Sequence, residues 1–260
     1  MPHCVDAVPV TFTDLTSNVF PLILRACRFL SHCLSLEQSE VLVQKEHIQV
    51  SIVWHISVLR SNCPRLSDPS FSMFFSDFVD VARHLVDTKK LTTPDRLTCE
   101  GRSAGGLLIG ASINQAPELF KVAILGVPFL DVVCTMTDAR IPLTTGEWDE
   151  WGNPNEEKYH GYMMEYCPMQ NVRAGATYPA CLITGGQHDS RVAFWEPAKF
   201  AATLRHATGA DSGPVCMKIE LSAGHFSASD RYKYLRELAY DYAFLLDQRG
   251  LADAKVENGV

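Results

Sequence analysis

The pattern of hydrophobic and polar positions divides the chain near residue 70. Upstream, apolar residues alternate with mostly polar ones from Ile48 to Val58, which is the period of a strand with one apolar face. Downstream, apolar residues recur at helical spacing from Phe75 to Val86. Between them, the segment Asn62 to Pro69 carries two prolines and is typical of a linker. We therefore expect an atypical N-terminal segment, residues 1–70, ahead of a more regular domain.

Short apolar strands and helices alternate after residue 90. The pattern predicts strands at Leu97–Glu100, Val122–Val127, Ala180–Thr184 and Met217–Leu221. It predicts helices at Ala104–Asn114, Trp195–His206 and Asp230–Gln248. This alternation indicates an α/β domain over residues 71–250, with a mostly parallel sheet and helices on both faces. We expect residues 251–260 to form a flexible tail.

A glycine-rich turn joins the strand at residues 97–100 to the helix that follows it. Gly101, Ser103 and Gly105 fit the pattern G-x-S-x-G, in which small residues permit a tight turn that holds the serine hydroxyl above the sheet. The turn also directs the Ala104 backbone N–H toward the place where an oxyanion would form. An ordinary glycine-rich βα turn has the same composition. The motif alone therefore leaves a nucleophile and a plain turn equally open.

Two later residues favour the nucleophile. A serine hydroxyl needs a base that removes its proton, and the base needs an acid that orients it. In the α/β-hydrolase fold these groups occur in the order serine, acid, histidine, each just after a strand. Asp189 follows the strand at residues 180–184, and His225 follows the strand at residues 217–221. The sequence therefore predicts Ser103, Asp189 and His225 as a catalytic triad.

Other residues are weaker candidates for the acid and the base. Asp131 also follows a strand, but Pro128 in that segment and a poor fit to the usual order make it the second choice. His188 is next to the predicted acid, and His206 lies within a predicted helix. A single histidine is more often structural than catalytic, so strand-end position favours His225.

Composition narrows the class of protein. A formal net charge of −7 offers no basic surface for a phosphate backbone, so we expect no nucleic-acid partner. The nine cysteines are scattered and never spaced C-x-x-C, which predicts free thiols and no metal site. Residues 2–14 do not resemble a secretory signal, and charges interrupt the apolar stretch from Val19 to Leu36. We expect a cytoplasmic protein without a membrane partner or a cofactor.

Five stretches of the sequence are similar to the oligopeptidase B serine peptidases of the prolyl oligopeptidase family. They are LTTPDRLTCEGRSAGGLLIGA, LFKVAILGVPFLDVV, IPLTTGEWDEWGNPNE, GGQHDSRVAFWEPAKF and AGHFSASDRYKY. The resemblance extends from Phe71 to about Gly250. It implies an α/β-hydrolase that cleaves short peptides after arginine or lysine through a covalent acyl-enzyme.

The resemblance also implies roles for individual residues. It assigns the triad to Ser103, Asp189 and His225, and it places the acidic residue of the substrate's basic side-chain pocket at Glu147. A carboxylate suits this task because it binds a planar guanidinium in bidentate fashion. Arg191 matches an arginine that holds the substrate backbone near the P2 position. Asp149 and Glu150 are a second acidic contact or a solvated face, and the solvated face is favoured for Glu150.

The sequence departs from the family upstream of residue 71. Family members carry a β-propeller that admits only short peptides, and a tyrosine hydroxyl that supplies a second oxyanion donor. Residues 1–69 contain no tyrosine and no pattern of four-stranded blades. The first strands of the sheet are also unrecognisable, which leaves one side of the nucleophile strand unpaired unless the strand at residues 48–58 covers it. We therefore interpret the chain as a fragment or mis-joined gene product, and we expect low solubility and weak turnover.

Two further functions remain open from the sequence. An esterase or acylaminoacyl-type hydrolase would use Ser103, Asp189 and His225 but would not need Glu147. A catalytically impaired remnant would keep the fold without efficient turnover.

Overall fold

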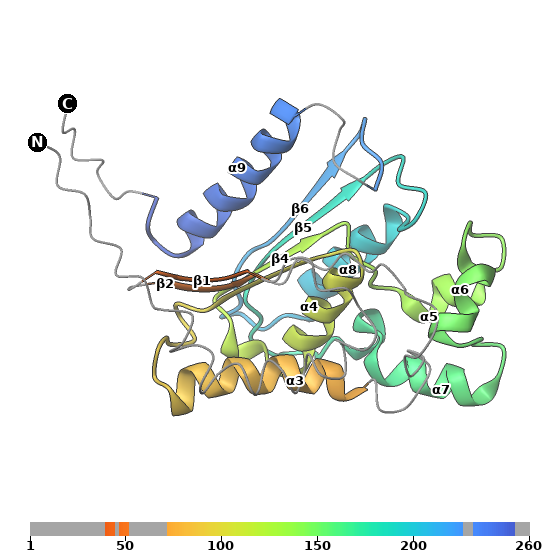
Figure 1. Ribbon diagram of the computed structural model, residues 1–260, viewed down its shortest axis with the longest axis horizontal. Coiled ribbons are helices and arrows are strands. Elements are labelled where there is room, and N and C mark those ends of the chain that lie inside the picture. Colours follow the sequence, from red (N-terminus) through yellow and green to blue (C-terminus); the bar gives the residue numbers. More distant parts are fainter. Residues whose placement is uncertain (1–39, 45–46, 52–71, 226–230, 253–260) are drawn as a thin grey trace, which may run out of the picture.

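The computed structural model describes residues 40–44, 47–51, 72–225 and 231–252. A six-stranded sheet in the order β1-β2-β3-β4-β5-β6 forms the centre of this part of the chain (Figure 1). The strands are β1 (Glu40–Gln44), β2 (His47–Ser51), β3 (Thr98–Arg102), β4 (Val122–Gly126), β5 (Ala180–Gly186) and β6 (Val215–Glu220). Strands β2 to β6 are parallel to one another, and β1 is antiparallel to β2.

Helices cover both faces of the sheet, as predicted. The α-helices are α3 (Ser72–Arg83), α4 (Ala104–Gln115), α5 (Val132–Thr137), α6 (Thr144–Trp151), α7 (Glu157–Tyr166), α8 (Trp195–Ala207) and α9 (Arg231–Gln248). Shorter helical turns lie at His84–Thr88, Pro117–Leu119 and Pro168–Asn171. Figure 1 shows α3, α4 and α8 on one face and α9 on the other, while α5, α6 and α7 gather beside the sheet.

The interior follows the alternation of side chains along the strands. In β4, Ala123 and Leu125 belong to the large cluster packed under α3, α4 and α8. Val122 and Ile124 point to the opposite face, where Phe244 and Leu245 of α9 cover them. All five residues of β4 are buried, which explains why this strand reads as an uninterrupted apolar run.

The nucleophile strand β3 has a neighbour on each side. Strand β4 pairs with one edge, and β2 pairs with the other in the register Gln49↔Thr98 to Ser51↔Glu100. Part of the strand predicted at residues 48–58 therefore covers the edge of β3 that would otherwise be unpaired. The strand predicted at residues 48–58 is present over His47–Ser51, while its remainder and the predicted linker at residues 62–69 lie outside the described residues.

Two features are absent from the residues that the structure describes. No helix in these ranges is both long enough and apolar enough to cross a membrane. No group of three or more histidine, cysteine, aspartate or glutamate side chains in the same ranges is arranged to hold a metal ion.

Candidate active site

The turn between β3 and α4 places Ser103 in a strained backbone conformation. Its φ of 56° and ψ of −120° are unusual for a residue with a side chain, and such strain costs about 1–3 kcal/mol. Glycine is required two residues before Ser103, because a Cβ on Gly101 would lie 2.2 Å from the carbonyl oxygen of Gly105. The tight turn predicted from G-x-S-x-G is therefore present. Helix α4 begins directly after Ser103, and the first backbone N–H groups of a helix have no acceptor within the helix.

Strand β4 and the residues after it fix the position of Ser103. The Ser103 N–H donates to the Gly126 carbonyl at 2.9 Å, and the Phe129 N–H donates to the Ser103 carbonyl at 3.1 Å. A Cβ on Gly106 would approach Pro128 to 2.4 Å, so α4 lies close against the same segment. These contacts attach the nucleophile turn directly to the β4–α5 connection.

Three side chains from separate strand ends meet at this turn. The Nε2 atom of His225 lies 3.0 Å from the Oγ atom of Ser103, although the two residues are 122 positions apart in the sequence. The Nδ1 atom of His225 lies 2.8 Å from Oδ2 of Asp189. Both of these side chains are almost completely buried: the exposed fraction is 7% for the His225 side chain and 1% for the Asp189 side chain.

The other oxygen of Asp189 is occupied by its own loop. Oδ1 accepts hydrogen bonds from the backbone N–H groups of Arg191 and Val192, each at 2.8 Å. One carboxylate oxygen therefore orders the β5–α8 loop, and the other faces the histidine. This arrangement is what an orienting acid requires.

The weaker candidates for acid and base lie elsewhere. Asp131 is buried, and the ammonium group of Lys199 pairs with it. His188 is exposed, and His206 is exposed in the last turn of α8. Among the described residues, the histidine within hydrogen-bond distance of Ser103 is thus His225.

A pocket of about 140 Å³ opens beside Ser103 and contains the predicted specificity residue. Glu147 and Arg191 both line it, together with apolar and small polar side chains from the β4–α5–α6 region. The sequence did not indicate these wall residues, which include Phe129, Thr135, Met136, Pro142, Leu143 and Trp151. The pocket has room for a side chain, because its volume is several times that occupied by one water molecule.

The carboxyl group of Glu147 is half-buried. Burial raises its pKa above the ordinary value for glutamate, while a hydrogen bond from Trp151 and the positive charge of Arg191 act in the opposite direction. A partly desolvated carboxyl group gains more from an incoming cation than an exposed one does. The site therefore has a group suited to bind a basic side chain.

The neighbouring acids differ from Glu147 in position. Asp149 is exposed and is not among the residues that line the pocket. The side chain of Glu150 lies outside the described residues. Within the described part of α6, Glu147 is thus the acid that the structure places at the pocket beside Ser103.

The Prolyl oligopeptidase family model matches residues 73–251. Protease 2 of Moraxella lacunata is 49% identical over 185 residues, which are 71% of this chain and 26% of that protein. The structure of oligopeptidase B from Leishmania major matches with a TM-score of 0.68 at 52% identity over 71% of this chain and 25% of that one. Oligopeptidase B from Trypanosoma brucei, with covalently bound antipain, matches with a TM-score of 0.65 at 58% identity over 68% and 24%.

The chain spans about a quarter of the length of these relatives. The matched region covers the parallel sheet from β3 to β6, its helices and the site around Ser103. It is the part that carries the α/β-hydrolase fold. On the extent of this match, the chain belongs to the prolyl oligopeptidase family.

Proposed function

We propose that this site is a serine hydrolase centre that cleaves peptide bonds after arginine or lysine through an acyl-enzyme. The observation that carries the proposal is the continuous contact of Ser103 Oγ with His225 Nε2 at 3.0 Å and of His225 Nδ1 with Asp189 Oδ2 at 2.8 Å. These distances lie within hydrogen-bond range and join nucleophile, base and acid in one line.

Acylation follows from this geometry. The Ser103 oxygen attacks the substrate carbonyl carbon while Nε2 of His225 takes the hydroxyl proton. The carbonyl oxygen becomes an oxyanion, to which the Ala104 N–H at the start of α4 donates. The C–N bond then breaks, the amine leaves with the proton from His225, and the acyl group remains as an ester on Ser103.

Deacylation uses the same groups in reverse. His225 removes a proton from water, the resulting hydroxide attacks the ester carbonyl, and the proton returns to the Ser103 oxygen as the acid is released. Asp189 accepts the hydrogen bond from Nδ1 of His225 and so stabilises the imidazolium formed in each half of the reaction. The covalently bound antipain in the Trypanosoma brucei relative supports covalent chemistry in this family.

Glu147 supports specificity for a basic residue. A guanidinium or ammonium group that enters the pocket would contact the carboxyl group of Glu147, which is partly desolvated by burial. Arg191 supports the same assignment, because it lines the pocket and can donate to a substrate backbone carbonyl while Glu147 binds the side chain.

The charge of Arg191 also favours one alternative. Because the positive charge of Arg191 opposes the rise in the pKa of Glu147, the two side chains can neutralise each other, and the pocket would then accept an uncharged acyl group. In that case the chain would be an esterase or acylaminoacyl-type hydrolase with the same triad. Substrate preference separates the two functions.

The test compares peptide substrates that differ only in arginine or leucine at P1. We expect a preference for arginine, and we expect Glu147→Gln to lower kcat/KM for the arginine substrate by about two or more orders of magnitude, since loss of one partner of a buried charge pair costs about 3–5 kcal/mol. Asp149→Asn, an exposed change on the same helix, is the matched control. Equal cleavage of both substrates by the parent chain would favour the alternative.

Turnover itself should be slow in the isolated chain. The oxyanion donor that we propose among the described residues is the Ala104 N–H, and an oxyanion site that lacks a second donor loses about 10²–10³ in kcat. Steady-state assays against a Ser103→Ala control measure this directly. A kcat within the ordinary enzyme range of about 1–10³ s⁻¹ would show that the second donor is dispensable.

A further inference from the structure

Glu196 is a buried acid for which the proposed reaction has no direct use. It lies in the first turn of α8, just after the loop that carries Asp189, and its side chain has no exposed surface. A buried carboxyl group is costly unless hydrogen bonds compensate for the lost water. The partners of Glu196 therefore indicate what it does.

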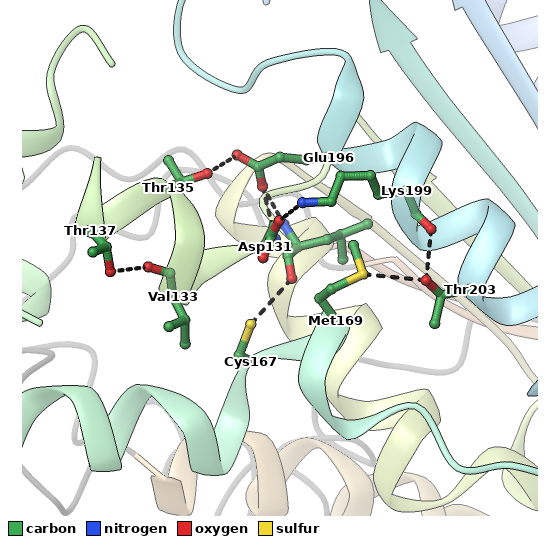
Figure 2. Close-up of polar contacts among 10 residues, drawn as sticks. Asp131, Val133, Thr135, Thr137, Cys167, Met169, Glu196, Lys199 and Thr203 are labelled. Atoms are coloured by element: carbon green, nitrogen blue, oxygen red, sulfur yellow. Dashed lines mark hydrogen bonds and ion pairs between the residues drawn. The ribbon is translucent and has the colours of Figure 1, made fainter. Parts of the chain in front are cut away.

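Three hydrogen bonds connect Glu196 to the segment that follows β4. Its Oε2 atom accepts from the backbone N–H groups of Leu130 and Asp131, each at 2.9 Å. Its Oε1 atom accepts from the hydroxyl of Thr135 at 2.6 Å. Figure 2 shows the Glu196 side chain reaching from α8 toward Asp131 and Thr135. One carboxyl group thus binds both the entrance to α5 and the helix itself.

The contacts of Glu196 continue to the pocket. The Thr135 carbonyl accepts from the hydroxyl of Thr144 at 3.2 Å, and the Met136 carbonyl accepts from Nε1 of Trp148 at 2.9 Å. Thr144 and Trp148 belong to α6, the helix that carries Glu147. An unbroken series of contacts therefore joins Glu196 to the helix of the pocket acid.

The nucleophile depends less on Glu196. Ser103 is fixed by its own hydrogen bond to the Gly126 carbonyl, and its carbonyl accepts from Leu107 of α4 as well as from Phe129. These contacts lie within β3, β4, α4 and the start of the β4–α5 connection, and they do not pass through α8. Loss of the Glu196 contacts should therefore disturb α5 and α6 more than the Ser103 turn.

We propose that Glu196 is a positioning residue that holds α5, and through it α6, so that Glu147 faces the pocket beside Ser103. The inference rests on the proposed function, because Glu147 matters only if the pocket binds a basic group. Glu196 acts through these two helices and does not itself line the pocket.

The surroundings of Glu196 define a conservative replacement. Asp131 and Lys199 form an ion pair beside it, and Cys134 lies near the same pair. A glutamine at position 196 can accept from Leu130 and Asp131 through its carbonyl oxygen while its NH₂ group donates to the Thr135 hydroxyl. An alanine removes all three contacts.

The experiment measures the pocket and the nucleophile separately. Benzamidine, a small amidinium cation, probes the pocket through its dissociation constant, and a small fluorophosphonate probes the reactivity of Ser103. We expect Glu196→Ala to weaken benzamidine binding at least about tenfold while the rate of fluorophosphonate labelling stays within about threefold. Glu196→Gln should stay within about threefold of the parent in both assays, and Glu147→Gln gives the affinity of a pocket without its acid.

Several results would overturn the inference. They are unchanged benzamidine affinity in Glu196→Ala, a fall in labelling as large as the fall in affinity, or a glutamine variant as impaired as the alanine variant. If the parent chain shows neither labelling nor benzamidine binding, the proposed function fails, and hydrogen–deuterium exchange decides the positioning role separately. Faster exchange in Glu196→Ala confined to residues 128–151 supports it, and unchanged or uniformly faster exchange contradicts it.

Discussion

The two sides of the candidate site are held in different ways. On the Ser103 side, β3 lies between β2 and β4, and the turn is packed so tightly that Gly101 has no space for a Cβ. On the His225 side, β6 is the outer strand of the described sheet, pairs only with β5 there, and is half-buried along its whole length. The position of Ser103 is therefore fixed by inner strands of the sheet, whereas His225 lies in a loop that follows the outer strand β6.

Contacts of the β5–α8 loop with the end of β6 and with the loop after β6 hold the His225 side together. The Gln187 N–H donates to the Glu220 carbonyl and the His188 N–H donates to the Ala223 carbonyl, each at 3.0 Å. The His225 side chain adds its own contact with Asp189. These bonds join the β5–α8 loop to the last residue of the outer strand β6 and to the loop that follows it, rather than to the central strands. Changes on the Ser103 side should therefore impair folding first, and changes on the His225 side should impair chemistry first.

The largest expected effect is on the Ser103 side. Gly101→Ala would place a Cβ 2.2 Å from the Gly105 carbonyl oxygen and 2.8 Å from Cγ1 of Ile109. The backbone of Gly101 and that of Gly105 cannot move apart without breaking the turn. We therefore expect the free energy of unfolding to fall by about 4 kcal/mol or more. Urea denaturation followed by circular dichroism measures it. Gly161→Ala, with open space around the new Cβ, is the control, and a similar midpoint for both variants would refute the steric account.

A smaller effect concerns the pH dependence of stability, which should come from the buried side. Burial raises the pKa of Glu196 to about 7, and the neighbouring Asp131 acts in the same direction, against the hydrogen bonds from Thr135, Asp131 and Leu130. Because the folded-state pKa is above the unfolded value, the folded chain binds more protons between about pH 4.5 and 7, and stability falls as the pH rises through that window.

Glu196→Gln should remove this part of the pH dependence. Relative to the parent, the variant should gain up to about 3 kcal/mol in unfolding free energy between about pH 4.5 and pH 8. Denaturation curves at both pH values measure the gain, and Glu165→Gln, an exposed change in α7, is the control. Parallel pH profiles for the parent and the Glu196 variant would show that this carboxyl group does not titrate in the window.

The smallest expected effect on folding comes from the His225 side. Gly186→Ala would bring a Cβ to 2.5 Å from the Gly224 carbonyl oxygen and 2.6 Å from that of Ala223, immediately before His225. An edge loop can yield where the interior cannot, so we expect stability to fall by only about 1 kcal/mol and fluorophosphonate labelling to slow about a hundredfold. Labelling at the parental rate would mean that the loop adapts without moving His225.

The long helices and the parallel strands could be predicted from the sequence, because the apolar residues of each follow a single helical or strand pattern. The strands at residues 98–102, 122–126, 180–186 and 215–220 and the helices α4, α8 and α9 lie close to their predicted positions. Ser103, Asp189 and His225 meet because strand order and a strand-end position place all three at one edge of the sheet.

The pocket could not be derived in the same way. Its walls come from α5 and α6, which have 6 and 8 residues and show no clear helical period. Glu196 looks like an ordinary helix charge in the sequence, and its burial arises only from the packing of α8 against the β4–α5 segment. Strand β1 was not predicted either, because Glu40–Gln44 is too short to show its pairing partner.

The central claim is that Ser103 is a nucleophile activated by His225 and Asp189. The direct measurement is mass spectrometry of the chain after treatment with a fluorophosphonate, with Ser103→Ala, His225→Ala and Asp189→Asn treated in parallel. We expect one adduct, on the peptide that contains Ser103, with no labelling in Ser103→Ala and strongly slowed labelling in the other two variants. An adduct on another serine, or labelling of Ser103 at an unchanged rate without His225, would contradict the account.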